Sequence, residues 1–192
     1  DLRTPMNAII GYTRLLLRKA QDKLDERQLR NLENIDTSAH NLLKLINEIL
    51  DLSRVEAGRI DVHPQPVDLQ QLAVECAAAI EPLIQAEVQL IQDIEAVPSL
   101  HTDGEILRKV LMNLLSNAVK FTDAGSITVS VKPVEDQVAI SISDTGMGIP
   151  SEDLPDIFEE FRQVERQGST EKEGTGLGLA IVKHIIESHG QN

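Results

Sequence analysis

Three polar side chains in the segment NLLSNAVKFT (residues 113–122) recur at helical spacing. Asn113 and Asn117 are four residues apart and Lys120 follows three residues later, so all three lie on one face of a helix. Amide oxygens and an ammonium group that point together suit a magnesium ion and the phosphates whose charge it neutralises. The same spacing also fits a solvated polar helix face, and the segment alone does not separate the two interpretations.

A carboxylate and two glycines follow the alternating segment VAISIS at residues 138–143. Asp144, Gly146 and Gly148 have the order D-x-G-x-G. A carboxylate at the end of a strand can accept a hydrogen bond from the amine of a nucleobase, and glycines let a ligand approach the backbone closely. Taken alone, the motif also fits a tight turn that begins a loop.

A third motif, Gly174-Thr175-Gly176-Leu177-Gly178, opens the last predicted helix. We call residues 174–178 the glycine turn. Free backbone N–H groups and the positive end of the helix dipole make such a turn an anion site. The G-x-G-x-G spacing is not the dinucleotide fingerprint, and the turn lacks the Gly-Lys-Ser/Thr of a P-loop.

Together the three motifs have an order that is more specific than any one of them. The order N-x-x-x-N, D-x-G-x-G, G-x-G-x-G resembles the N box and the two glycine boxes of sensor histidine kinases, whose ATP-binding domain has the Bergerat fold. The segment FEEF at residues 158–161 stands where that family has its F box, within the ATP lid. The opening segment DLRTPMN (residues 1–7) resembles the end of the H box, His-Asp/Glu-Leu-Arg-Thr-Pro-Leu.

The resemblance implies roles for residues of the nucleotide pocket. Asn117 looks like the magnesium ligand and Asn113 like its neighbour in the pocket. Lys120 looks like a phosphate contact. Phe121 is expected to flank the nucleotide, although packing in the core explains it equally well.

The two glycine boxes divide between the ends of the nucleotide. Asp144 looks like the partner of the adenine amine, with Gly146 and Gly148 shaping the adenine side. All five residues of the glycine turn, Thr175 and Leu177 included, are expected on the phosphate side.

Three further residues take expected roles in phosphoryl transfer. Asp1 looks like the acidic residue that assists proton transfer from the acceptor histidine. Thr4 looks like the residue that positions water for dephosphorylating a partner response regulator. As alternatives, Asp1 is a helix-start charge and Thr4 a first-turn residue. Many members have an arginine where this chain has Gln163, and Arg162 is expected to substitute for it as a phosphate contact.

The acceptor histidine of the family is expected immediately before Asp1, where the sequence starts. None of the five histidines in the chain is followed by Asp/Glu-Leu-Arg-Thr-Pro: His40, His63, His101, His184 and His189. A truncation and a modified or unrecorded histidine both stay open. Family members also continue beyond Asn192 into further strands, so we expect the catalytic sheet to lack an edge.

Two long helices in residues 1–60 must present the phosphotransfer segment. Apolar residues at 3–4 spacing form a seam on the first helix: Leu2, Met6, Ile9, Thr13, Leu16 and Ala20, widened by Ile10 and Leu17. The second helix carries one row at Leu29, Leu32, Ala39, Leu43, Ile46 and Leu50 and another at Ile35, Leu42, Leu45, Ile49 and Leu52. One partner helix cannot cover both rows, so we predict a homodimer whose hairpins form a four-helix bundle. Packing on the second domain is the alternative.

A proline-containing linker at 61–68 leads to an ATP-binding domain at 69–192. We predict helices at 69–86, 103–120 and 175–188, strands at 88–94, 127–131 and 138–143, and a loop at 149–174. Helices beside an antiparallel sheet make a two-layer α/β sandwich, so the whole chain is predicted to be α+β.

Composition narrows the possible partners of this 192-residue chain. The net charge of −13 is concentrated after residue 60, where 22 acidic residues outnumber 8 basic ones. Such a surface repels nucleic acid and anionic lipid. No apolar run reaches the ~18–20 residues that span a bilayer. A single cysteine excludes an internal disulfide framework and fits a reducing compartment.

We therefore expect the catalytic core of a sensor histidine kinase that uses ATP and Mg²⁺. Its expected partners are a second copy through residues 1–60 and the receiver domain of a response regulator. The expected location is the cytoplasm, with membrane attachment of a longer protein left open. A Bergerat-fold ATPase and a dimeric scaffold that only docks a regulator are the alternatives.

Overall fold

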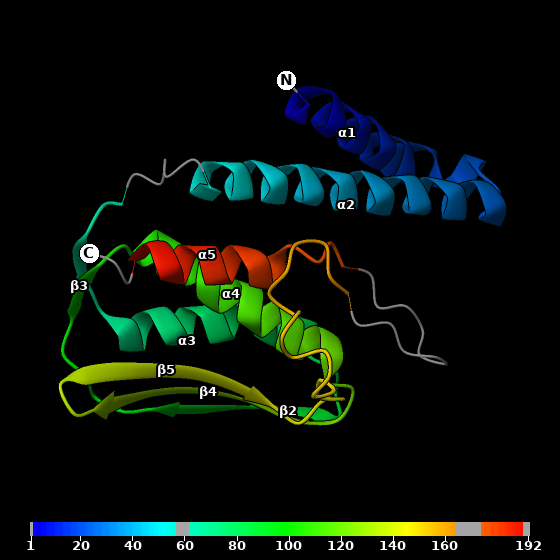
Figure 1. Cartoon of the computed structure of the whole chain (residues 1–192). Helices are drawn as coiled ribbons and strands as arrows, with labels where there is room; N and C mark the ends of the chain where they lie inside the picture. The colour runs from blue at the N-terminus through cyan, green and yellow to red at the C-terminus, as the bar shows by residue number, and fades with distance from the viewer. Residues whose placement is uncertain (1, 57–61, 164–173, 190–192) are drawn as a thin grey trace. The chain divides into compact units, whose positions relative to one another are not determined.

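The computed structural model describes residues 2–56, 62–163 and 174–189 (Figure 1). The chain divides into two compact units, Asp1–Ala57 and Gly58–Asn192. The first is a helical hairpin and the second is a sheet with helices, which confirms the predicted α+β class.

The hairpin consists of α1 (Arg3–Ala20), a short 3₁₀ turn (Gln21–Lys23) and α2 (Glu26–Glu56). A reciprocal pair of hydrogen bonds starts α2. The N–H of Gln28 donates to Asp25 Oδ1 at 2.8 Å, and the N–H of Asp25 donates to Gln28 Oε1 at 3.0 Å. This capping box satisfies two N–H groups that the helix itself cannot pair.

Side chains between α1 and α2 correct the predicted seam. Met6, Ile10 and Ala39 form the buried cluster, whereas Ile9 is 43% exposed and Leu16 is 49% exposed. Thr13 is also buried, so the buried face of α1 keeps Met6 and Thr13 of the predicted seam and adds Ile10. Its centre is turned by roughly 50°, half of the rotation per residue in a helix with 3.6 residues per turn. Two adjacent apolar rows leave such a rotation undetermined from spacing alone.

Three of the five residues in the second apolar row of α2 are exposed, whereas Leu45 is half-buried and Leu52 is buried. Ile35 is 46% exposed, Leu42 46% and Ile49 44%. The first row instead turns toward α1, where Leu43 and Ile46 pack against the buried cluster. One hairpin thus leaves an apolar strip on α2 uncovered, which consists of Ile35, Leu42 and Ile49 at seven-residue spacing.

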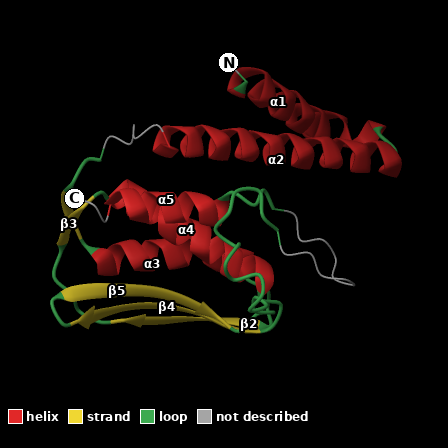
Figure 2. Cartoon of the chain, in the orientation of Figure 1, coloured by secondary structure: helices red, strands yellow, loops and turns green. Residues whose placement is uncertain are grey.

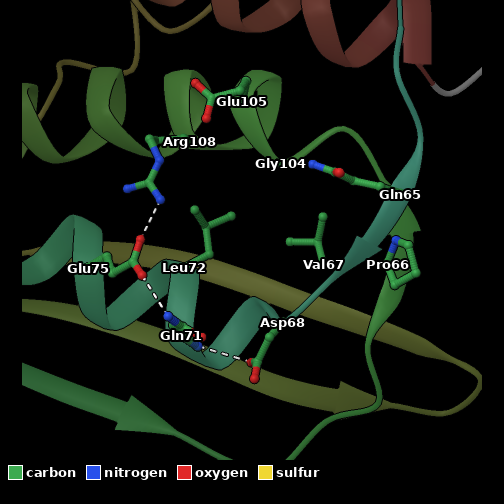
Figure 3. Close-up of a pocket in the computed structure, with 10 residues that line it drawn as sticks. All are labelled: Gln65, Pro66, Val67, Asp68, Gln71, Leu72, Glu75, Gly104, Glu105 and Arg108. Atoms are coloured by element: carbon green, nitrogen blue, oxygen red, sulfur yellow. Dashed lines mark hydrogen bonds and ion pairs between the residues drawn. The ribbon is translucent and has the colours of Figure 1, made fainter.

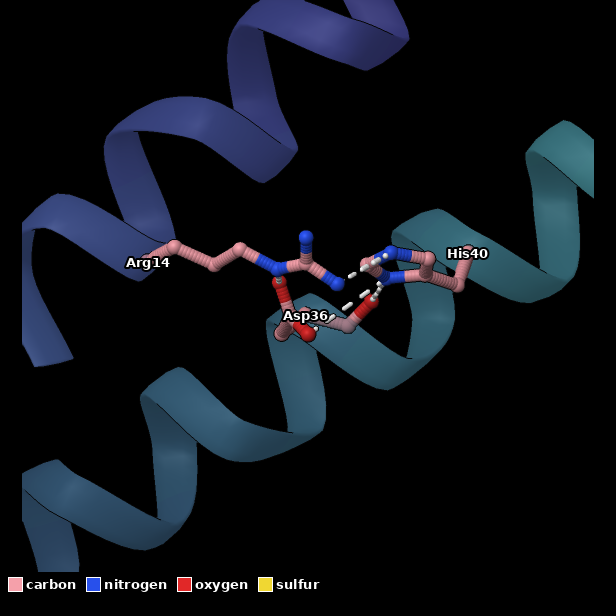
Figure 4. A network of polar contacts seen from close by, with 3 residues as sticks. All are labelled: Arg14, Asp36 and His40. Carbon is pink, nitrogen blue, oxygen red and sulfur yellow. Dashed lines mark hydrogen bonds and ion pairs between the residues drawn. The ribbon is translucent and has the colours of Figure 1, made fainter.

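A polar network interrupts the apolar contact between the two helices (Figure 4). Asp36 occupies a gap in the first row of α2, with its Oδ1 at 3.5 Å from Nε of Arg14. The Arg14 guanidinium donates to Nε2 of His40 at 2.9 Å, and Nδ1 of His40 donates to the Asp36 carbonyl oxygen at 2.7 Å. Because arginine always donates, the proton of a neutral His40 sits on Nδ1. Through its hydrogen bond with Arg14, His40 therefore links α2 to α1.

In the second unit the helices gather on one side of the sheet (Figure 2). The elements are β1 (Gln65–Val67), α3 (Leu69–Ile80), a 3₁₀ turn (Glu81–Leu83), β2 (Val88–Ile94), β3 (Leu100–Thr102), α4 (Gly104–Phe121), β4 (Gly125–Val134), β5 (Gln137–Asp144) and α5 (Gly178–His189). The strand order is β2-β4-β5. This arrangement confirms the predicted two-layer sandwich.

Two features of the sheets correct the predictions. β2 pairs in parallel with β4, because α4 carries the chain back across the sheet between them, and β5 is the antiparallel partner of β4. The sheet is mixed, not antiparallel. In addition, the segment expected as a linker contains β1, which pairs with β3.

Alternation along β4 builds the core. Ile127, Val129 and Val131 are buried and point toward the helices, whereas the residues between them are less buried. They meet side chains of α3 such as Ile80 and of α4 such as Leu115. The helix predicted for 69–86 already ends at Ile80 and gives way to the 3₁₀ turn that contains Pro82.

Asp103 fixes the start of α4. Its Oδ1 accepts from the N–H groups of Glu105 and Ile106 at 3.0 and 3.1 Å, and its Oδ2 accepts from the N–H of His63 at 2.9 Å. Burial favours the neutral acid, but these donors outweigh it and hold the pKa of Asp103 below its usual value. The ionised side chain therefore anchors the helix whose far end carries the candidate site.

Candidate nucleotide-binding site

The last turns of α4 bring Asn113, Asn117 and Lys120 to one face, as their spacing predicted, and all three are partly buried. The first turn of α5 lies against this face: a Cβ atom added to Gly178 would be 3.6 Å from Oδ1 of Asn113. The polar face of α4 therefore meets the beginning of α5.

Lys120 connects this face to the start of the glycine turn. A Cβ on Gly174 would lie 2.6 Å from Nζ of Lys120, so the ammonium group rests against the Gly174 backbone. The same Nζ lies 4.6 Å from the centre of the Phe121 ring. A positive charge thus sits beside backbone groups that suit an anion.

Asp144 lies at the end of β5 and is exposed. Its Oδ1 accepts from the N–H of Gly146 at 2.9 Å and from the hydroxyl of Thr122 at 3.5 Å. Both hydrogen bonds from described residues end at Oδ1. This arrangement orients the carboxylate and directs Oδ2 to other donors.

Two backbone contacts join the end of β5 to the end of α4. The N–H of Met147 donates to the carbonyl oxygen of Phe121 at 3.2 Å. A Cβ on Gly146 would lie 2.3 Å from that same oxygen, so a larger residue does not fit there. Gly148 has φ +65°, a conformation that glycine adopts without strain. Thr122, which is 1% exposed, was not predicted as a site residue. The sequence signal that could have identified Thr122 is its position directly after the predicted helix that carries Asn113, Asn117 and Lys120.

The glycine turn precedes α5, which starts at Gly178 and not at Thr175 as predicted. The hydroxyl of Thr175 accepts from the N–H of Leu177 at 3.3 Å, and Leu177 is fully buried. Gly176 has φ +73°, and a Cβ there would lie 2.7 Å from the carbonyl carbon of Phe161. Residues 161 and 162 therefore pack directly on the turn.

The polar side chains that follow Phe161 separate into two environments. Arg162, expected as a phosphate contact, pairs with Asp153 at 3.5 Å and with Asp156 at 3.7 Å. Gln163, which had no predicted role, donates from Nε2 to the carbonyl oxygen of Gly174 at 2.8 Å. The structure thus brings Gln163, and not the Arg162 guanidinium, to the glycine turn.

The two residues expected to act in phosphotransfer belong to the first unit. Thr4 is exposed in the first turn of α1. Asp1 lies outside the described residues.

A separate hollow lies between β1 and the first turns of α3 and α4 (Figure 3). Its walls include Asp68, Glu75, Glu105 and Arg108, and none of the predicted nucleotide-site residues. The Arg108 guanidinium already pairs with Glu75, whose pKa is lowered by that bond first and by a bond from Gln71. The remaining carboxylates repel a triphosphate, so this hollow is a poor nucleotide site.

The donor set fits magnesium held jointly with phosphates. Among the described residues, no three His, Cys, Asp or Glu side chains gather in a way that could hold a metal ion. An amide oxygen of Asn117 beside Lys120 matches the habit of Mg²⁺, which keeps few protein ligands and takes the others from water and phosphate.

Comparisons with known proteins agree with this geometry. A profile of the His Kinase A (phospho-acceptor) domain matches residues 1–58, and a profile described as Histidine kinase-, DNA gyrase B-, and HSP90-like ATPase matches residues 102–192. The chain belongs to the sensor histidine kinases. Within the described residues of this family member, no helix is both long and apolar enough to cross a membrane.

Curated relatives match over nearly the whole chain. The circadian input-output histidine kinase CikA of Synechococcus elongatus is 39% identical over 195 residues, which are 99% of this chain and 26% of that protein. The signal transduction histidine-protein kinase BarA of Escherichia coli is 34% identical, over 99% of this chain and 21% of that protein. The chain thus spans about a quarter of the length of such histidine kinases.

Solved structures support the same fold. Full-length ShkA in complex with AMPPNP has a TM-score of 0.81 at 31% identity, covering 98% of this chain and 39% of that one. The Acinetobacter baumannii histidine kinase AdeS has a TM-score of 0.67 at 26% identity, covering 97% of this chain and 85% of that one.

Proposed function

We propose that this chain is the catalytic core of a sensor histidine kinase. It transfers the γ-phosphoryl group of Mg²⁺-ATP to a histidine, which in the family precedes the residue matching Asp1, and onward to an aspartate of a response regulator. The convergence of three sequence-distant motifs along the last turns of α4 carries the proposal: Lys120 lies against Gly174, Asn113 against Gly178, and the Phe121 carbonyl against Gly146.

Each group of the site has a task in this reaction. Asp144 accepts a hydrogen bond from the adenine amine, because its carboxylate is exposed and oriented by Gly146 and Thr122. Asn117 supplies an oxygen ligand for Mg²⁺, and Asn113 completes the polar wall toward α5. When bound, Mg²⁺ neutralises phosphate charge and draws electron density from the transferring phosphoryl group.

On the phosphate side, Lys120 and the N–H groups of the glycine turn stabilise the charge that spreads over the γ-phosphoryl oxygens. Such transfer depends on positioning and charge more than on covalent help from the protein. Asp1 receives the proton of the acceptor histidine, and Thr4 positions a water molecule when the core dephosphorylates its regulator.

The uncovered apolar strip on α2 supports a homodimer. We propose that two hairpins bury their strips in a four-helix bundle, and that the receiver domain of the regulator docks on this bundle. Nothing in this assembly requires nucleic acid, and the acidic second unit disfavours it.

The direct test is labelling with [γ-³²P]ATP of a chain that has a histidine placed before Asp1. The proposal predicts protein-bound phosphate that is labile to acid and stable to base, and that moves to a receiver domain. The matched control has glutamine in place of that histidine. Release of free phosphate without any acid-labile phosphoprotein would favour the Bergerat-fold ATPase instead.

A further inference from the structure

One side-chain contact fixes the beginning of the glycine turn. Nε2 of Gln163 donates to the carbonyl oxygen of Gly174 at 2.8 Å. The neighbouring Arg162 does not share this task, because its guanidinium pairs with Asp153 and Asp156. Gln163 thus holds the peptide bond between Gly174 and Thr175 from the side of the polar segment that follows Phe161.

The orientation of that peptide bond follows from its planarity. Described peptide bonds are all trans, and in a trans peptide the C=O and the N–H point in opposite directions. Because the Gly174 carbonyl points to Gln163, the N–H of Thr175 points away from it. The contact therefore directs the N–H end of the Gly174–Thr175 peptide dipole to the side of the turn that faces away from Gln163.

The other residues of the turn are fixed by contacts that do not involve Gln163. Leu177 is fully buried and its carbonyl oxygen accepts from the N–H of Ile181 at 2.9 Å. The Thr175 hydroxyl accepts from the Leu177 N–H, and Gly176 packs on the Phe161 backbone. Gly174 has no side chain of its own, so groups outside the turn hold it: Nζ of Lys120 lies against its backbone, and Gln163 provides the hydrogen bond to its carbonyl oxygen.

We propose that Gln163 is a positioning residue for the triphosphate. Its amide holds the Gly174–Thr175 peptide so that the Thr175 N–H donates to a phosphoryl oxygen and the Gly174 carbonyl oxygen is turned away. Without the amide the peptide is free to rotate and present its carbonyl oxygen to the phosphates, which repels them. This inference rests on the proposed function, because it assigns Gln163 to the same ATP site.

The test compares ATP with adenosine as ligands of the intact chain. Calorimetry with a non-hydrolysable ATP analogue and Mg²⁺, and separately with adenosine, measures both affinities for wild type, Gln163→Ala and Gln163→Glu. We expect Gln163→Ala to weaken the ATP analogue about tenfold, as for one lost hydrogen bond to a charged group, and to leave adenosine unchanged. Gln163→Glu should weaken the analogue further, because its carboxylate faces the Gly174 carbonyl oxygen.

Gln89→Glu is the matched control. It adds the same charge to an exposed glutamine of β2 in the same unit, outside the site. Its affinities should equal those of wild type. Thermal unfolding of each variant, followed by circular dichroism, accompanies the titrations and should show the second unit intact.

Each outcome decides the inference. A selective loss of the ATP analogue in both Gln163 variants supports it. Unchanged affinity for the analogue, or an equal loss for analogue and adenosine, overturns it and leaves the proposed function standing. A wild-type chain that binds neither ligand overturns the proposed function itself.

Discussion

The two units of the chain differ in how completely they bury their apolar side chains. Among the described residues, the hairpin buries a cluster of three apolar side chains between its helices, whereas the second unit buries a cluster of thirteen between sheet and helices. Along α2 three residues of the outer apolar row, Ile35, Leu42 and Ile49, are each more than two-fifths exposed. In the inner row, Asp36 occupies a position where the pattern calls for an apolar residue.

This difference shows which unit can act alone. The second unit encloses its own core and presents polar groups at the end of α4, so the proposed nucleotide site consists of residues of one chain. The hairpin leaves three apolar residues of its outer row exposed, and in the proposed homodimer a second copy would cover them with a surface of the same length and pattern. Substitutions in the hairpin should therefore leave nucleotide binding intact, and substitutions in the second unit should leave dimerisation intact.

The largest expected effect concerns the polar face of α4. Asn117→Ala removes the proposed oxygen ligand of Mg²⁺, so Mg²⁺-dependent binding of an ATP analogue should fall below detection at millimolar nucleotide. Isothermal titration calorimetry measures it. Ser116→Ala, at the exposed neighbouring position, is the matched control and should bind as wild type does. Unchanged affinity in Asn117→Ala would show that this residue is not a metal ligand. A change in the dimer dissociation constant of this variant would show that the two units are not independent.

The hairpin is expected to respond next. Leu42→Glu places a charge on the exposed row, and burying it without a partner should weaken dimerisation about 100-fold, roughly 2.7 kcal/mol. Sedimentation equilibrium of the intact chain provides the dissociation constant. Thr37→Glu, exposed about 140° around the helix from Leu42, is the control and should not change it. A dimer that tolerates Leu42→Glu would place the interface elsewhere.

A smaller effect is expected at the adenine side. Asp144→Asn replaces one acceptor oxygen by a donor, so affinity for ATP should fall about tenfold and discrimination against GTP should weaken. Titration of both nucleotides against Asp144→Asn and the control Asp136→Asn, an exposed aspartate at the β4–β5 turn, gives the comparison. If ATP affinity stays within about twofold, under ~0.4 kcal/mol, the adenine role is wrong.

The smallest effect is on stability. Asp103→Ala removes the cap of α4 and should lower the free energy of unfolding of the second unit by about 1 kcal/mol at pH 7. Because the pKa of Asp103 is lowered in the folded state, this stabilisation is present above the unfolded pKa of about 3.9 and is lost as the pH falls through the folded pKa. Urea unfolding at pH 7 and at pH 3 should show the gap to wild type shrink in acid. A gap that grows in acid would contradict the capping role, and Asp136→Ala is the control.

Much of the fold followed from patterns of apolar residues. The long helices, the strand Val88–Ile94 and the α+β class were predicted correctly, because each has a clear period of 3.6 or 2. The short strands β1 and β3 were missed, since three residues carry no period and Pro66 disfavours a strand. The predicted antiparallel sheet was wrong for β2 and β4, which pair in parallel, because periodicity does not encode the direction of a neighbouring strand.

The candidate site also has features that local sequence spacing predicts and one contact that it does not. Asn113, Asn117 and Lys120 share a helical face because local spacing determines it, and the glycine turn meets them as the order of motifs implied. The contact of Gln163 with Gly174 joins residues eleven positions apart and depends on the tertiary structure, so no local sequence pattern predicts it.

The central claim is that the nucleotide binds where α4, β5 and the glycine turn converge. A crystal structure of the chain with Mg²⁺ and a non-hydrolysable ATP analogue tests it most directly. The account predicts the adenine amine on Asp144, the metal ion on Asn117, and the phosphates between Lys120 and the glycine turn. A nucleotide bound instead in the hollow between β1, α3 and α4 would contradict it.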